Sequence, residues 1–373
     1  FTTKQDMRDN YPFGFLTQSQ DTIVRMHCTS GTTGNPVAVL HDRHDLLSWG
    51  NMVARSMWAT GVRPGDVFQN TSGYGLFTGG LGFQYGAELL GCMAIPAGAG
   101  NSKHHIKLMR DFGTTVTHAV ASYMARLYEV FLEMGLDPQR DTKLQRMFIG
   151  AEPHSEETRQ RIQEMFGCKA FNSYGMTEMN GPGVAFECEH QTGMHLWEDN
   201  YLMEVVDPET LEPLPDGEWG ELILTTLDRH AMPILRYRTR DLTRIIPGSC
   251  PCGRTARRID RIRGRSDDMF IIKGCNVFPI QIERVLMQMP QLGNDYLITL
   301  DRQNSTDTML LQCELKPEAF TDEYTTLEKL QRKVASAIHA EINVTPAVQL
   351  VAPNTLPKST GKAVRVQDLR KNY

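Results

Sequence analysis

The sequence predicts an α/β fold, with mixed β-sheets flanked by helices in a large first domain and a small α+β domain after it. Glycine-rich turns separate alternating apolar runs and amphipathic helical stretches, a pattern typical of α/β layering. A chain of 373 residues exceeds the usual size of one hydrophobic core, so we expect two domains. The composition changes in the polar segment from Arg265 to Asp268, which predicts domains at 1–266 and 267–373.

Two helices of the large domain follow from spacing and end signals. Apolar residues recur at helical spacing from Met124 to Met134, and the pattern stops before Gly135. A second helix is expected after Ser155, which can cap it, and glycine should end it at Gly167. We interpret both as core helices.

Strands are predicted where apolar runs are bounded by turns. Residues 221–225 form such a run after a series of turns, which predicts a strand entered from a hairpin. In the small domain, strands are expected at 296–300 and 309–315, followed by a helix around 327–342.

Composition excludes several classes of function. Lysine and arginine number 39 against 44 aspartates and glutamates, a net charge of −5 that gives no electrostatic basis for binding nucleic acid or anionic lipid. No apolar run approaches the length of a membrane span, and the first residues carry no secretory signal. We expect a cytoplasmic protein with small-molecule partners.

The segment His27–Pro36 is the most informative stretch of the chain. Its glycines let the backbone approach a ligand closely, and its hydroxyl and amide groups can donate to an anion. The residues that would cradle phosphate are Thr29, Ser30, Gly31, Thr32, Thr33 and Gly34. It is not a Walker motif, because Asn35 stands where that motif has lysine. The alternative is an ordinary solvated turn.

Further segments follow this loop in a fixed order along the chain. They are Gly150-Ala151-Glu152-Pro153, Asn172-Ser173-Tyr174-Gly175-Met176-Thr177-Glu178, Tyr237–Asp241, Gly264–Asp268, Lys273–Pro279 and Ser359–Lys362. Together with the loop, they resemble the motifs of the adenylate-forming enzymes, the family of acyl-CoA synthetases, peptide-synthetase adenylation domains and luciferases, and within it the phenylacetate-CoA ligases. The resemblance spans nearly the whole chain. Since the chain begins at Phe1 within a family motif, we expect a short N-terminal segment to precede it.

The resemblance implies an ATP-dependent ligase that activates an aryl carboxylic acid as an acyl-adenylate and transfers it to coenzyme A. The loop would hold the β- and γ-phosphates, Thr177 the α-phosphate, and Glu178 a Mg²⁺ ion, which prefers oxygen ligands. Tyr174 would stack on adenine, and Asp241 would accept hydrogen bonds from ribose. The remaining predicted nucleotide-binding residues are Gly150, Ala151, Glu152, Pro153, Asn172, Ser173, Gly175, Met176 and Arg265. Read alone, Tyr174 is as well explained by ordinary packing, and Thr177-Glu178 by a helix start.

The resemblance also assigns residues of the small domain. Lys362 would pair with the substrate carboxylate and the α-phosphate, although a surface lysine is the plain alternative. The small domain would be mobile and rotate about Asp267 between the two half-reactions, and Gly274 would line the path of the coenzyme A thiol.

The acid pocket is assigned to the glycine-rich segment Gly73–Gly80. Tyr74, Gly75 and Phe77 combine aromatic rings with a small residue, as a slot for an aryl acid would. No local cluster of lysine or arginine suggests a second anionic group on the substrate. A glycine-rich turn beside core aromatics is the alternative.

A zinc site is predicted from cysteine and histidine outside the motifs. Cys188, Cys250 and Cys252 supply thiols, and His195 is the expected fourth ligand, with His190 as the alternative. Thiolates with imidazole suit tetrahedral Zn²⁺, and a closed four-ligand site would be structural. Free thiols and a disulfide remain open at this point.

Other functions share these motifs. The nearest is an adenylating enzyme that loads an aryl acid onto a carrier-protein thiol, and a catalytically silent nucleotide-binding regulator is another. A catalytically silent protein is disfavoured, because the sequence retains Lys362, Glu178 and Thr177. A homodimer is expected by analogy only.

Overall fold

The computed structural model describes residues 1–29, 36–303, 306–321, 323–357 and 363–370. The chain separates into two compact units. The first unit comprises Phe1–Val120, Arg126–Ala151 and Gln163–Ile262, and the second comprises Ala121–Ala125, Glu152–Ile162 and Arg263–Tyr373. The boundary between residues 266 and 267 stays a prediction.

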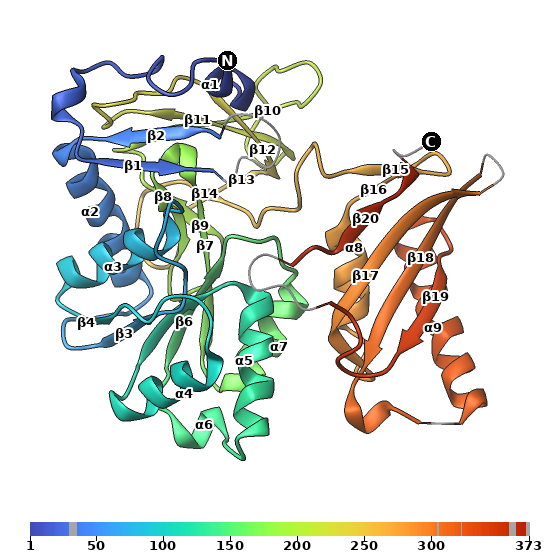
Figure 1. The fold of residues 1–373 in the computed structure, drawn as a ribbon. Helices are drawn as coiled ribbons and strands as arrows, with labels where there is room; N and C mark the ends of the chain where they lie inside the picture. Colours follow the sequence, from blue (N-terminus) through green and yellow to red (C-terminus); the bar gives the residue numbers. More distant parts are fainter. Residues whose placement is uncertain (30–35, 304–305, 322, 358–362, 371–373) are drawn as a thin grey trace. The chain divides into compact units, whose positions relative to one another are not determined.

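Within the described residues, a nine-stranded mixed sheet forms the centre of the first unit (Figure 1). In spatial order its strands are β13 (Ile245–Ile246), β14 (Arg258–Ile259), β9 (Met194–Leu196), β8 (Gly181–Glu187), β7 (Lys169–Met176), β6 (Arg146–Gly150), β5 (Val116–Ala119), β3 (Val67–Asn70) and β4 (Met93–Ile95). Strands β4, β3, β5, β6 and β7 pair in parallel, and the pairs from β7 to β13 are antiparallel.

Helices cover this sheet. They are α2 (Arg43–Ala59), α3 (Gly79–Leu90), α4 (Ser102–Asp111), α5 (Ala121–Glu133), α6 (Pro138–Asp141) and α7 (Glu156–Phe166). Helices α2 and α3 contact each other and β8. Helix α5 meets α7 through Phe131 and Phe166, whose ring centroids lie 6.1 Å apart (Figure 1). The described helices include none with both the length and the apolar run needed to cross a bilayer.

Phenylalanine rings fix the centre of the sheet. Phe148 of β6 lies 5.6 Å from Phe83 of α3 and 5.1 Å from Phe186 of β8, measured between ring centroids. All three are at most 1% exposed. Burying each ring stabilises the fold by roughly 1.5–3 kcal/mol. This packing fixes β6 and β8 on either side of β7, which carries the predicted site residues Asn172–Met176.

Smaller elements complete the first unit. Strands β1 (Arg25–Cys28) and β2 (Ala38–His41) pair antiparallel, and β10 (Tyr201–Val206), β11 (Gly220–Thr226) and β12 (Tyr237–Thr243) form an antiparallel sheet. The short helices are α1 (Lys4–Asp9), η1 (Gln20–Thr22) and η2 (Thr177–Met179).

The second unit has its own core. Strands β15 (Phe270–Ile272) and β16 (Cys275–Val277) form a hairpin, and β19 (Ala347–Val351), β18 (Thr306–Leu315), β17 (Leu292–Gln303) and β20 (Val366–Asp368) form a sheet in that order. Helices α8 (Pro279–Met287), η3 (Pro317–Ala319) and α9 (Tyr324–Ile342) accompany them. Buried apolar residues from these strands and helices form one cluster.

The secondary-structure predictions are confirmed. The helix expected from Met124 to Met134 is α5, and the helix expected after Ser155 is α7, where the Ser155 Oγ accepts from the Thr158 N–H at 3.1 Å. The strand at 221–225 lies in β11, and the small-domain elements correspond to β17, β18 and α9.

Candidate active site

Two hydrogen bonds between Thr29 and Val37 join the chain on either side of the predicted phosphate loop. The Thr29 N–H donates to the Val37 carbonyl and the Val37 N–H donates to the Thr29 Oγ1, both at 3.1 Å. These bonds continue the β1–β2 ladder to the base of the loop. The loop residues Ser30, Gly31, Thr32, Thr33 and Gly34 lie outside the described residues.

The predicted acid-pocket segment is attached to β1. The Leu76 carbonyl accepts the Cys28 N–H at 3.0 Å and lies 3.0 Å from the His27 Nδ1. Burial lowers the pKa of His27, so its ring is neutral at pH 7 and Nδ1 can serve as the donor. The structure therefore brings the residues before the phosphate loop together with the segment Gly73–Gly80.

The three predicted pocket residues differ in exposure. Tyr74 is half-buried, and its hydroxyl oxygen accepts from the Asn70 Nδ2 at 3.2 Å. Phe77 is 56% exposed, and Gly75 is exposed as well. A role in substrate binding stays a prediction for all three.

The two residues predicted to hold adenosine are bonded to each other. Tyr174 of β7 donates from its hydroxyl to the Asp241 Oδ2 of β12 at 2.6 Å. Both residues are buried, at 9% and 8% exposure. The fold thus joins two residues that are 67 positions apart in the chain, and their binding of adenosine stays a prediction.

Gly175 allows β7 to pass close to the next strand. A Cβ at this position would lie 2.0 Å from the Gly181 carbonyl oxygen, so no larger residue fits without moving the backbone. Met176 ends β7, and Thr177 follows in η2, half-buried. The predicted motif therefore has a steric reason for its glycine, and a nucleotide-binding role of Gly175 stays a prediction.

Glu178 is a buried carboxylate with fixed partners. It is 4% exposed, and its Oε1 accepts from the Tyr237 hydroxyl at 3.2 Å and lies 3.5 Å from the Lys4 Nζ. Its backbone carbonyl accepts from the Arg229 Nη1 at 2.6 Å. These contacts satisfy the charge that burial would otherwise penalise, and they hold the carboxylate in one place.

Asn172 and Ser173 hold neighbouring strands together. The Asn172 N–H donates to the Glu187 Oε2 at 2.8 Å, and its side-chain amide donates to Oε1 at 3.4 Å. The Ser173 Oγ donates to the Ile149 carbonyl at 3.3 Å, and Ser173 pairs with Gly150. Ala151 follows at a positive φ of 65°. Asn172 and Ser173 therefore position the strand, whatever else they bind.

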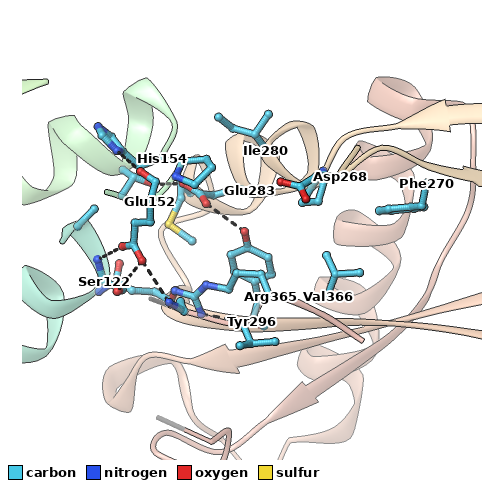
Figure 2. Close-up of a pocket in the computed structure, with 18 of the residues that line it drawn as sticks. Ser122, Glu152, His154, Asp268, Phe270, Ile280, Glu283, Tyr296, Arg365 and Val366 are labelled. Atoms are coloured by element: carbon cyan, nitrogen blue, oxygen red, sulfur yellow. Dashed lines mark hydrogen bonds between the residues drawn. The ribbon is translucent and has the colours of Figure 1, made fainter. Parts of the chain in front are cut away.

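Glu152 and Pro153 belong to the second unit. The Glu152 carboxylate accepts the Ser122 N–H at 2.6 Å (Figure 2). It also accepts the Ala363 N–H at 3.2 Å. Ala363 directly follows Lys362, which itself lies outside the described residues. The chain just past the predicted catalytic lysine is thus hydrogen-bonded to Glu152 of the predicted nucleotide-binding segment Gly150–Pro153.

A pocket of about 410 Å³ lies in the second unit, and Glu152 is among its lining residues (Figure 2). Within it, Glu283 accepts from the Ser155 N–H at 2.9 Å, the Thr158 hydroxyl at 2.6 Å and the Tyr296 hydroxyl at 3.0 Å. Burial raises the pKa of Tyr296 and keeps it a donor. Sequence reasoning missed this network because its members come from separate segments that carry no local pattern.

The predicted hinge residue lies in a turn and is ion-paired. The Asp268 N–H donates to the Arg265 carbonyl at 3.2 Å, which closes a β-turn around Asp267. The Arg265 guanidinium donates to both carboxylate oxygens of Asp267, at 2.8 and 3.0 Å. The predicted seam is therefore a defined turn in this structure.

Gly274 has a conformational reason to be glycine. Lys273 and Gly274 connect β15 to β16 with φ values of 49° and 78°, the two positive angles of a type I′ hairpin turn. A Cβ on Gly274 would meet no described atom within 4 Å. Its role toward coenzyme A stays a prediction.

The predicted zinc ligands lie together. Ligand atoms of Cys188, His195, Cys250 and Cys252 are all within 4.8 Å of one another. Cys188 follows β8, His195 is in β9, and both other cysteines lie between β13 and β14. His190 is exposed and is not in this group.

Distances within the cluster exclude a disulfide between its buried cysteines. The sulfur atoms of Cys188 and Cys250 are 3.7 Å apart, well beyond the S–S bond length of about 2.05 Å. The Cys252 Sγ lies 3.4 Å from the His195 Nε2, and the His195 Nδ1 lies 3.2 Å from the Ala256 carbonyl. A proton on Nδ1 shared with that carbonyl leaves the Nε2 lone pair facing the thiols.

Comparison with known proteins agrees with these observations. The family model described as AMP-binding enzyme matches residues 7–227, and the model described as AMP-binding enzyme C-terminal domain matches residues 274–370. A phenylacetate-coenzyme A ligase of Pseudomonas putida is 44% identical over 99% of this chain and 84% of its own length. One from Thermus thermophilus is 42% identical over 100% and 86%.

A solved structure of 2-hydroxyisobutyryl-CoA ligase, in the postadenylation state with R3-HIB-AMP, covers 100% of this chain and 80% of its own, with 31% identity and a TM-score of 0.93. The chain therefore belongs to the AMP-binding, adenylate-forming enzymes and, within them, to the phenylacetate-coenzyme A ligase family. The predicted fold class and family are confirmed.

Proposed function

We propose that this protein is an AMP-forming acid–coenzyme A ligase that activates an aryl carboxylic acid. ATP and the acid give an acyl-adenylate and diphosphate, and coenzyme A then displaces AMP to give the aryl thioester. The observation that carries the proposal is the 2.6 Å bond between Tyr174 and Asp241, which unites the residues assigned to adenine and ribose in one buried pair.

Each residue contributes to charge or position. Asp241 would accept hydrogen bonds from the ribose hydroxyls in the orientation that Tyr174 gives it, and an acceptor-only carboxylate suits that task. Thr177 would donate to the α-phosphate. Lys362 would neutralise charge that develops as the carboxylate attacks this phosphorus, the kind of stabilisation that is usually the largest catalytic contribution.

The donor set at Glu178 fits a magnesium ion. Its carboxylate is held in place by Tyr237 and Lys4, and hard oxygen donors are what Mg²⁺ prefers. When bound, the ion would neutralise phosphate charge. A conservative Glu178→Gln change should raise the Mg²⁺ concentration needed for half-maximal activity, whereas an unchanged requirement would remove this assignment.

The acid and the acceptor can be identified in one experiment. The protein is incubated with ATP, Mg²⁺, coenzyme A and a panel of aryl and aliphatic acids, and the products are analysed by mass spectrometry. Aryl thioesters support the proposal, and aliphatic thioesters alone would overturn the aryl assignment. Acyl-adenylate that accumulates with coenzyme A present would favour a carrier-protein acceptor instead.

The cysteine cluster fits a structural zinc ion. Tetrahedral ligands at Zn–S bonds of about 2.3 Å lie roughly 3.8 Å apart, and those at a Zn–S and a Zn–N bond roughly 3.5 Å apart. The observed separations are 3.7 Å for Cys188 and Cys250 and 3.4 Å for Cys252 and His195. The cluster contains none of the residues assigned to the nucleotide, so the metal would serve folding.

Metal analysis of chelator-washed protein tests the zinc assignment. We expect close to one equivalent of zinc in the wild type and in His190→Ala, and a loss of most of it in Cys250→Ser. Less than a third of an equivalent in the wild type would count against the site.

A homodimer and a cytoplasmic location also stay proposals.

A further inference from the structure

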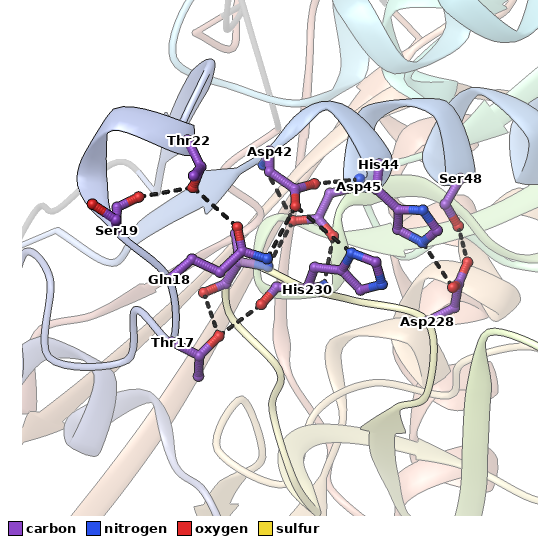
Figure 3. Close-up of polar contacts among 11 residues, drawn as sticks. Thr17, Gln18, Ser19, Thr22, Asp42, His44, Asp45, Ser48, Asp228 and His230 are labelled. Carbon is purple, nitrogen blue, oxygen red and sulfur yellow. Dashed lines mark hydrogen bonds and ion pairs between the residues drawn. The ribbon is translucent and has the colours of Figure 1, made fainter.

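Two histidines and an aspartate from distant segments meet on the first unit (Figure 3). His44 lies in the first turn of α2, and Asp228 and His230 lie in the connection between β11 and β12. One ligand atom from each lies within 4.8 Å of the others. The His44 Nε2 is 2.8 Å from the Asp228 Oδ1.

The two imidazoles face each other. Their centroids are 3.8 Å apart and their planes differ by 6°. A neutral imidazole has a lone pair free for a metal.

The carboxylate is held by neighbours. The second oxygen of Asp228 accepts from the Ser48 Oγ at 2.7 Å and from the Asn200 Nδ2 at 3.3 Å. Hydrogen bonds of this kind orient metal ligands and strengthen metal binding. The first oxygen therefore stays directed at His44 (Figure 3).

The connection is also fixed to α2. Asp45, which is fully buried, accepts the His230 N–H at 2.7 Å and the Ala231 N–H at 3.1 Å. These bonds set the backbone of His230 beside His44. The side chains of His44 and His230 are 43% and 51% exposed, so turning their rings toward a shared ion costs little packing.

We propose that His44, Asp228 and His230 form a binding site for a divalent transition-metal ion of the zinc, nickel and copper class. Two imidazoles and one carboxylate select these ions over Mg²⁺ and Ca²⁺, which prefer oxygen ligands. The ion takes the place of the proton between His44 and Asp228. It would join α2 to the connection that also carries Arg229, the donor to the Glu178 carbonyl.

Calorimetric titration with NiCl₂ tests the site. Full-length protein is first loaded with one equivalent of zinc to fill the cysteine cluster, and excess metal is removed. We expect one Ni²⁺ per chain in the wild type, and at least tenfold weaker binding in His44→Ala, His230→Ala and Asp228→Asn. His104→Ala removes an exposed histidine of α4 and should bind as the wild type does.

A spectroscopic measurement shows whether the histidines bind the metal directly. Bound Cu²⁺ should show electron paramagnetic couplings to two imidazole nitrogens in the wild type and to one in His230→Ala, and metal-free melting temperatures check that each variant folds. Wild-type protein that binds no Ni²⁺, or ligand variants that bind it as tightly as the wild type, would overturn the site.

Discussion

The hydroxyl of Tyr174 orients a neighbouring carboxylate. By donating to the Asp241 Oδ2 at 2.6 Å, it fixes the orientation of the carboxylate that is assigned to ribose. A hydrogen bond to a charged group contributes about 1.5–3 kcal/mol, more than a neutral one. The pair therefore acts as one unit, and a change at either residue should alter nucleotide binding.

Replacing Tyr174 with phenylalanine separates stacking from positioning. The ring is kept, but the bond to Asp241 is lost, so we expect the KM for ATP to rise about tenfold with a smaller change in kcat. ATP–diphosphate exchange measures both. Tyr128→Phe on α5 is the matched control and should leave KM unchanged. An equal effect of both variants would contradict the positioning role.

Lys362 should matter for one half-reaction only. Lys362→Ala removes the charge assigned to the substrate carboxylate and α-phosphate, so acyl-adenylate formation should fall roughly 100-fold or more. Thioester formation from a supplied acyl-adenylate should be largely spared. Rapid-quench assays of each half-reaction provide the measurement, and equal losses in both would refute the assignment.

At the scale of elements, substitutions at Gly274 in the β15–β16 hairpin can distinguish two effects of an added side chain. One is strain in the backbone, and the other is obstruction of coenzyme A. Gly274→Ala places a Cβ at a positive φ and should destabilise the protein by roughly 1–2 kcal/mol, whereas asparagine tolerates this conformation better. Stability should therefore fall in the order Gly, Asn, Ala. If the thiol path runs beside Gly274, the KM for coenzyme A should rise in the different order Gly, Ala, Asn.

Urea unfolding and steady-state kinetics provide the two rankings. Gly135→Ala is a suitable control, because Gly135 also has a positive φ and open space around its Cβ position. It should lose stability with no change in the KM for coenzyme A. Identical rankings for stability and KM would show that the backbone conformation accounts for both.

The turn around Asp267 can be tested by fixing its backbone. Proline there restricts φ and should stall thioester formation more than adenylation, since rotation is needed only between the two steps. Asp267→Ala removes only the exposed ion pair with Arg265, which contributes little, and should retain both activities. Single-turnover rates of adenylation and of thioester formation measure the effect of each variant. If both rates are unchanged in the proline variant, Asp267 is not the hinge.

At the scale of the whole molecule, local sequence patterns predicted single helices and strands, whereas the order of the motifs along the chain predicted the family. Helices α5 and α7 followed from periodicity and capping, and the motif order indicated that Tyr174 and Asp241 belong to one site. The Glu283 network and the His44 cluster were not predictable, because each joins residues whose neighbours in sequence carry no shared pattern. Only the tertiary fold brings such residues together.

The proposed zinc site predicts an effect on global stability, because its ligands come from strands at one end of the large sheet and their connections. Cys188 follows β8, His195 belongs to β9, and Cys250 and Cys252 precede β14, which pairs with β9. Losing a structural metal should cost on the order of 3–5 kcal/mol and lower the melting temperature by roughly 10 °C.

Calorimetry of metal-free protein against zinc-loaded protein, with hydrogen exchange on β8, β9 and β14, measures this loss and its location. Cys188→Ser should reproduce it, and Cys168→Ser, a thiol outside the cluster, should not. Protection should fall first in these strands and later in β5 and β6, because the parallel half of the sheet is packed by Phe148 and its neighbours independently of the metal. Uniform loss of protection across the sheet would instead mean that the metal stabilises the first unit as a whole.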